Sequence, residues 1–79
     1  MPPFPSRKAR ELRRVLARAP LSYRSKRSPG GSHIRLTSAA GYPELTWAHH
    51  DRATLPPGLV RKILVEQVGL SEEEALGLL

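Results

Sequence analysis

Cysteine is absent from this 79-residue chain, which excludes disulfide bonds and thiolate metal sites. Aromatic residues are scarce, so a small core must be built mainly from aliphatic side chains. No apolar run approaches the ~20 residues that span a bilayer, and the basic N-terminus lacks the apolar segment of a secretory signal. We therefore expect a small cytoplasmic domain that neither enters a membrane nor depends on a cofactor.

Acidic residues are almost missing from the first half of the chain. Residues 1–35 contain ten Lys or Arg and one acid, whereas residues 36–79 contain three bases and six acids. This asymmetry indicates a polyanionic partner for the first half, with nucleic acid as the leading candidate. An acidic protein partner, or a solvated helix face without any partner, would give the same composition.

The order of predicted elements is α-β-β-β-α followed by a short helix. Three prolines predict a flexible lead-in over residues 1–5, and residues 6–79 are expected to form one domain. Apolar residues at helical spacing predict a helix over 7–19, with Ser6 as N-cap and Pro20 ending it. The fold class is therefore α+β.

Alternating apolar and polar residues predict three short antiparallel strands, over residues 21–27, 32–37 and 44–48. In the third strand Leu45 and Trp47 are expected to face the core, although Trp47 could instead stack on bases, as could Tyr23. An apolar stripe from Leu59 to Val68 predicts the next helix, with Gly69 at its end. Ser71 to Glu74 reads as a capping box that opens the last helix.

The stretch Gly30-Gly31-Ser32-His33-Ile34-Arg35-Leu36 carries the main candidate site. Paired glycines predict a turn, and the alternation that follows places Ile34 and Leu36 toward the core while His33 and Arg35 face outward. Histidine can exchange a proton near neutral pH, and a neighbouring arginine suits a phosphate group. A surface histidine without any function is the alternative interpretation.

Motifs spread over nearly the whole chain resemble those of the HicA toxin family, the small mRNA interferases of bacterial type II toxin-antitoxin systems. The matching motifs are Glu11-Leu12 with Val15-Leu16, Gly31-Ser32-His33, Thr46-Trp47-Ala48-His49-His50, Leu55-Pro56-Pro57-Gly58, and Val68-Gly69-Leu70-Ser71-Glu72. Their order and spacing together carry the resemblance. It implies a fold similar to the double-stranded RNA-binding domain (dsRBD), metal-independent RNA cleavage, and inhibition by a HicB-type antitoxin protein.

The resemblance places the catalytic histidine of the family on His33, and a second family histidine on His50. RNA supplies its own nucleophile, the 2′-hydroxyl group, so cleavage needs a proton acceptor, a proton donor and a cation near the phosphate. We expect His33 to act as general base or acid. The residues expected to bind RNA are Gly31, Ser32, Arg24, Lys26, Arg27, Arg35 and His50.

Three other interpretations compete with this one. DNA binding by the free chain is a weak one, because no predicted helix combines exposed base-reading side chains with a helix-turn-helix pattern. A non-catalytic module that binds RNA or an antitoxin could use the same fold, with His33 in a structural role. A metal site built from His33, His49, His50 and Asp51 is disfavoured, because their spacing is not typical of zinc ligands and neighbouring strand residues face opposite ways.

Overall fold

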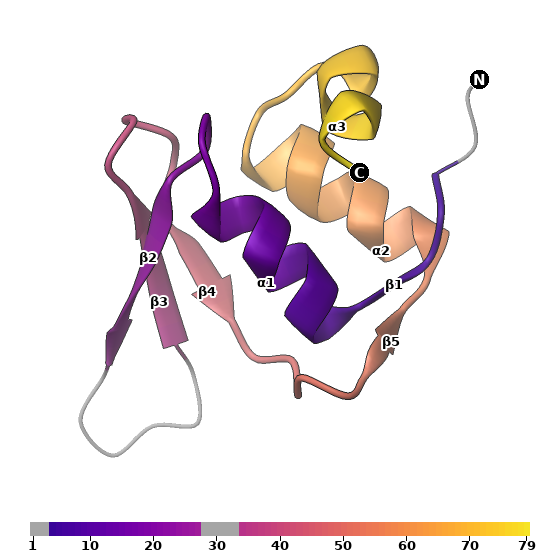
Figure 1. The fold of residues 1–79 in the computed structure, drawn as a ribbon, viewed down its shortest axis with the longest axis horizontal. Helices are drawn as coiled ribbons and strands as arrows, with labels where there is room; N and C mark the ends of the chain where they lie inside the picture. The colour runs from indigo at the N-terminus through magenta and orange to yellow at the C-terminus, as the bar shows by residue number, and fades with distance from the viewer. Residues whose placement is uncertain (1–3, 28–33) are drawn as a thin grey trace.

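The computed structural model describes residues 4–27 and 34–79 and shows an α+β fold with two antiparallel sheets. A three-stranded sheet lies at one side and a two-stranded pair at the other, with the helices between and above them (Figure 1). The predicted three-stranded antiparallel sheet is thus confirmed. The elements are β1 (Arg7–Lys8), α1 (Ala9–Ala17), β2 (Tyr23–Arg27), β3 (Ile34–Ser38), β4 (Leu45–Trp47), β5 (Thr54–Leu55), α2 (Pro57–Arg61), η1 (Lys62–Gln67) and α3 (Glu72–Leu78).

The larger sheet has the strand order β2-β3-β4, so β3 is central and β2 is an edge strand. Its register aligns Ser25 with Leu36 and Leu36 with Leu45. Leu36, Leu45 and Trp47 are buried, as the alternation predicts for one face of a sheet. Ser25 shares that row of positions but is exposed, so the core reaches only part of β2.

The first helix begins two residues later than predicted, and Ser6 is not its N-cap. Arg7 and Lys8 are extended and pair with Leu55 and Thr54, which draws them into a sheet instead of the helix. Lys8 occupies the cap position, and its backbone N–H donates to the Glu11 carboxylate at 3.0 Å. Strand pairing with β5 therefore takes the place of helical hydrogen bonding for the backbone of Arg7 and Lys8.

The loop before β5 completes the start of α1. The backbone N–H of Ala9 donates to the carbonyl of Ala53 at 2.8 Å, and that of Arg10 to the carbonyl of Asp51 at 3.2 Å. These bonds satisfy two donors that a helix start leaves without intrahelical partners. At the other end α1 stops at Ala17, before the Ala19-Pro20 peptide, because a residue that precedes proline disfavours helical dihedrals.

The second predicted helix is confirmed as α2 running directly into the π-helical turns of η1. Pro57 lies at its start, where its missing N–H costs nothing. Val60, Ile63, Leu64 and Val68 are buried, as the predicted stripe requires. The segment ends at Gly69, whose φ of +93° is the left-handed conformation that glycine adopts without strain.

One hydrophobic cluster joins the helices to the inner face of the larger sheet. Phe4 belongs to it and is only 8% exposed, so the expected lead-in contributes a core residue. Trp47 is 3% exposed, and its indole Nε1 has no hydrogen-bond partner within the described part of the chain. The buried members are Phe4, Ala9, Leu12, Val15, Leu16, Leu21, Tyr23, Leu36, Leu45, Trp47, Leu55, Val60, Ile63, Leu64, Val68, Leu70 and Ala75.

The predicted capping box at the start of α3 is confirmed by two reciprocal hydrogen bonds. The backbone N–H of Glu74 donates to Ser71 Oγ at 3.1 Å, and the backbone N–H of Ser71 donates to Glu74 Oε1 at 3.2 Å. The bonds from Ser71 lower the pKa of the Glu74 carboxyl. Its ionised form is therefore favoured by folding.

Replacing Glu74 with glutamine should change how stability depends on pH. Because folding lowers the Glu74 pKa, the charged carboxylate stabilises the fold above the ordinary glutamate pKa of 4.5, and this contribution disappears as pH falls through the folded pKa. Urea unfolding at pH 7 and pH 3 measures the effect. The free energy of unfolding of wild type should exceed that of Glu74→Gln by more at pH 7 than at pH 3, and an equal difference at both pH values would contradict the prediction.

No helix in the two described ranges is both long and apolar enough to cross a membrane.

Candidate functional site

Three of the predicted site residues, Gly31, Ser32 and His33, lie outside the described residues. In the sequence His33 immediately precedes Ile34, the first residue of β3. Ile34 pairs with Arg27 of β2 on one side and with Trp47 of β4 on the other. The strand that follows the Gly-Ser-His motif is therefore the central strand of the sheet.

Three of the predicted RNA-binding residues lie on the outer face of this sheet. Arg24 and Lys26 are alternate residues of β2, and Lys26 is directly opposite Arg35 of β3. All three side chains are exposed, on the face opposite the buried row. Arg27, also predicted, holds the last position of β2, opposite Ile34. The structure thus brings Arg24, Lys26 and Arg35 together as one basic face.

Arg35 is held by an acid on the same surface. Its Nε lies 3.0 Å from Glu44 Oε1, and both side chains are more than half exposed. Exposed ion pairs contribute about 0–1 kcal/mol, since water screens the charges and ordering the side chains costs entropy. A phosphate group could therefore replace Glu44 as the partner of Arg35 at small cost.

His50 lies in the loop between β4 and β5, and its side chain is exposed. Its carbonyl oxygen accepts from the backbone N–H of Ala53 at 2.9 Å, within the turn that completes the start of α1. His49 is half-buried and packs edge-on against Trp47, with ring centroids 5.0 Å apart. Among the described residues, no hydrogen bond or ion pair links His50 to the basic face of the sheet.

Tyr23 and Trp47 are part of the core and cannot stack on bases in this structure. They are 4% and 3% exposed. The hydroxyl of Tyr23 donates to the carbonyl oxygen of Pro43 at 2.6 Å. The pKa of Tyr23 is raised mainly by burial and, to a smaller extent, by the nearby Tyr42. The core interpretation of Trp47 is confirmed, and the alternative of base stacking is wrong for both residues.

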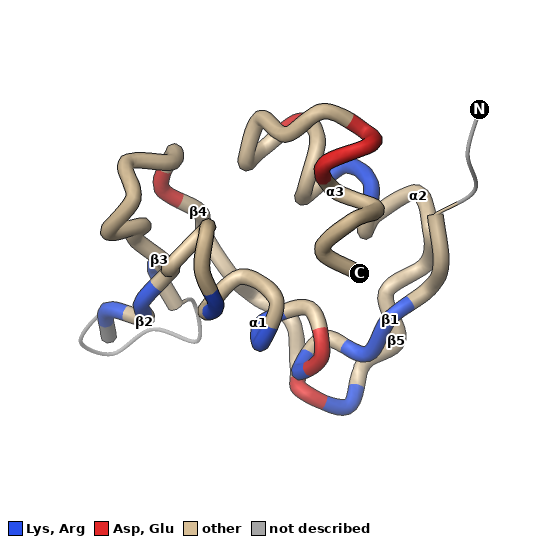
Figure 2. The backbone as a smooth tube through the Cα atoms, turned by 45° about the horizontal axis from the view of Figure 1, so that its top comes forward, with Lys and Arg blue, Asp and Glu red and all other residues tan. Residues whose placement is uncertain are grey.

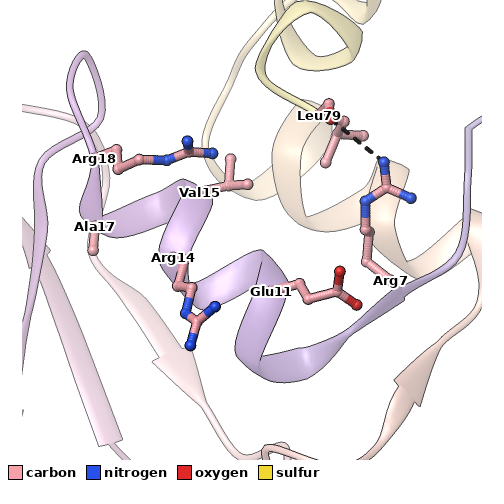
Figure 3. Close-up of a pocket in the computed structure, with 7 residues that line it drawn as sticks. All are labelled: Arg7, Glu11, Arg14, Val15, Ala17, Arg18 and Leu79. Carbon is pink, nitrogen blue, oxygen red and sulfur yellow. Dashed lines mark hydrogen bonds between the residues drawn. The ribbon is translucent and has the colours of Figure 1, made fainter.

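The arginines of α1 form a second basic region, visible in blue along the helix (Figure 2). The excess of basic residues in the first half of the chain is evident from the sequence, but the hollows that border this helix are not. A hollow of about 560 Å³ lies between α1 and the last residue, Leu79 (Figure 3). Its lining residues are Arg7, Glu11, Arg14, Val15, Ala17, Arg18 and Leu79.

The arginine side chains that line this hollow do not converge on a common position. Arg7 donates from Nη2 to the carbonyl oxygen of Leu79 at 3.4 Å, while Arg14 and Arg18 extend to opposite sides of the helix (Figure 3). A site for one small anion needs converging donors. The contact between residues 72 positions apart also explains why the sequence pattern gives no sign of this hollow.

Comparisons of this chain with protein-family models, with curated proteins and with solved structures find no match. The function is therefore inferred from the motifs, residues and geometry of the chain itself.

Proposed function

We propose that this protein is a metal-independent endoribonuclease, the toxin of a type II toxin-antitoxin pair, with His33 as its catalytic residue. The observation that carries the proposal is the Gly31-Ser32-His33 motif, placed in the sequence directly before a central strand whose exposed face carries Arg35 beside Lys26. The motifs that resemble the HicA family supply the kind of substrate, mRNA.

The proposed reaction uses the RNA 2′-hydroxyl as nucleophile. His33 accepts its proton while the bond from the 2′-oxygen to phosphorus forms and the bond from phosphorus to the 5′-oxygen breaks. Water or His50 returns a proton to the departing 5′-oxygen. A guanidinium such as that of Arg35 offsets the charge that develops on the phosphate. The products are a 2′,3′-cyclic phosphate end and a 5′-hydroxyl end.

A dsRBD-like arrangement is the second part of the proposal. Its support is the order of elements, α1 before the three strands and α2 after them, together with the shared core. Buried residues of α1 and η1, such as Leu12 and Leu64, join one cluster with Leu36 and Leu45 of the sheet. The short pair β1–β5 would then be an addition that ties the start of α1 to the segment before α2.

A HicB-type antitoxin is the proposed inhibitor. Inhibition requires only that the partner cover the residues that meet RNA, and a basic surface is readily masked by an acidic protein. Among the residues whose side chains are described, the outer face of the sheet offers Arg24, Lys26 and Arg35 against one acid, Glu44.

Incubating the purified protein with a long RNA in the presence of EDTA tests the proposed activity. We expect fragments that end in 2′,3′-cyclic phosphate and begin with 5′-hydroxyl, because the nucleophile and the proton transfers need no metal ion. An RNA that stays intact would contradict the nuclease and favour the alternative function, a non-catalytic module that binds RNA or an antitoxin.

A further inference from the structure

A continuous row of arginines runs from the exposed side of α1 over the edge of the sheet. Arg10, Arg13 and Arg14 border one hollow of about 480 Å³, together with Ala17 and Asp51. Arg13 and Ala17 also border a neighbouring hollow of about 340 Å³, whose other wall includes Arg24 of β2. The two hollows share Arg13 and Ala17, so basic side chains border them from the helix to the edge strand.

We name this surface the α1–β2 track and define it by Arg10, Arg13 and Arg24. Because β2 is an edge strand, no further strand in the described ranges 4–27 and 34–79 separates the track from the outer face of the sheet. Arg24 belongs to both surfaces, and Lys26 follows it two residues later on that face. The track therefore leads toward the strands that flank the Gly-Ser-His motif in the sequence.

None of the track arginines forms an ion pair within the described residues, although the acidic Asp51 borders the same hollow as Arg10 and Arg13. The ion pairs found there involve Arg35 and Arg61, whose partners are Glu44, Glu66 and Glu72. Arg10, Arg13 and Arg24 have none. Arg10 also lies in the first turn of α1, where a positive charge opposes the helix dipole. Helix stability alone does not explain its position.

The spacing and chemistry of the track suit a chain of phosphates. Residues three or four apart on a helix are separated by about 4.5–6 Å along its axis, which resembles the repeat between neighbouring phosphates of a nucleotide strand. All the track residues are arginines, whose planar guanidinium groups donate in pairs to phosphate oxygens. A row of such groups can follow a backbone without reading its bases.

The track is poorly suited to a protein partner. Stable protein interfaces depend on buried anchors, mostly aromatic or large apolar side chains that are exposed before binding. The large apolar residues that border the track, Leu16, Tyr23 and Leu36, are at most 4% exposed and already belong to the core. Ala17 is the exposed apolar residue in both hollows.

We infer that the α1–β2 track binds the phosphodiester backbone of an RNA strand over several nucleotides, independently of base sequence, and guides it toward the outer face of the sheet. The inference rests on the proposed function for the identity of the polyanion. If the track binds RNA in this way, the affinity of the protein for RNA should increase with RNA length and decrease steeply with salt concentration.

The test compares two double variants that lose the same charge, both in a His33→Ala background that prevents cleavage. Arg10→Gln with Arg13→Gln removes two track residues. Arg18→Gln with Lys62→Gln removes two exposed cations outside it. Glutamine retains good helix propensity, and thermal unfolding by circular dichroism checks that both variants are folded. The measurement is fluorescence anisotropy with oligouridylates of about 6 and about 24 nucleotides, a range that brackets common single-strand site sizes.

We expect the track variant to bind the longer RNA at least about tenfold more weakly than the control variant. The slope of log affinity against log salt should fall by about 1.4, since each lost phosphate contact on a single strand contributes about 0.7. Equal affinities of the two double variants would overturn the inference. Unchanged RNA binding with lost binding of poly-L-glutamate would also overturn it, in favour of an acidic protein partner.

Failure of the track inference can be distinguished from failure of the proposed nuclease activity, because this experiment measures binding without cleavage. A protein that binds RNA through Arg10 and Arg13 but leaves RNA intact would contradict the nuclease and support the track. If the protein cleaves RNA but the track variant binds RNA as tightly as the control variant, the nuclease is supported and the track is contradicted.

Discussion

Substituting His33 with alanine is expected to lower the rate of RNA cleavage by about 100-fold or more, the usual contribution of a general acid or base. The 2′-hydroxyl is a weak nucleophile until a base removes its proton, and alanine offers no acceptor. Single-turnover cleavage of a long RNA in EDTA, comparing wild type with His33→Ala, measures the loss. Equal rates for the two proteins would reject His33 as a catalytic residue.

His50→Ala is the second variant of that experiment, because it removes the exposed imidazole that is the other candidate for proton transfer. We expect a smaller loss of rate, since water can protonate the leaving oxygen in place of His50. The same unfolding midpoint for both variants would establish that lost cleavage reports lost chemistry. If His50→Ala lost as much activity as His33→Ala, the two histidines would form an acid-base pair.

The parts of the fold that follow from local sequence pattern could be predicted. Alternation placed Leu45 and Trp47 on the buried face of a strand, because side chains of a strand point alternately to its two faces. The capping box of Ser71 and Glu74 could also be predicted, since its bonds join residues three positions apart. In each case the pattern and the interaction lie within a few residues of each other.

The parts that depend on distant residues could not be predicted. The sequence predicts a helix that begins at Arg7, yet Arg7 pairs with Leu55 and Lys8 with Thr54, 48 and 46 positions away, instead of forming the first helical turn. A two-residue strand is too short to show an alternating pattern. Likewise, the prolines around Phe4 indicated an extended segment but not that this side chain packs into the core.

The candidate site likewise has features that local sequence pattern predicts and features that depend on tertiary packing. Alternation along two strands was enough to place Arg24, Lys26 and Arg35 on one exposed face, and the register adds that Lys26 and Arg35 are opposite each other. The approach of Arg13 to Arg24 could not be predicted, because it depends on how α1 packs over β2. Sequence identifies which residues are basic, and packing decides which of them form one surface.

The stability of the domain should depend strongly on Leu12, which lies in α1 with no exposed surface. Leu12→Ala is expected to lower the free energy of unfolding by about 2–5 kcal/mol, the range for a buried leucine whose removal leaves a cavity. Alanine is the best helix former, so the loss would reflect packing and not helix propensity. Because a domain of this size gains only about 3–5 kcal/mol from its core, much of the variant should be unfolded at 25 °C.

Urea unfolding followed by Trp47 fluorescence and circular dichroism measures this loss, with Leu76→Ala as the control. Leu76 packs at the margin of the same cluster on α3 and is half-buried, so its truncation should cost clearly less than that of Leu12. Equal unfolding curves for wild type and Leu12→Ala would show that α1 does not anchor the core. In that case the positions of Arg10 and Arg13 would not be fixed relative to Arg24, because all three depend on α1 being packed against β2.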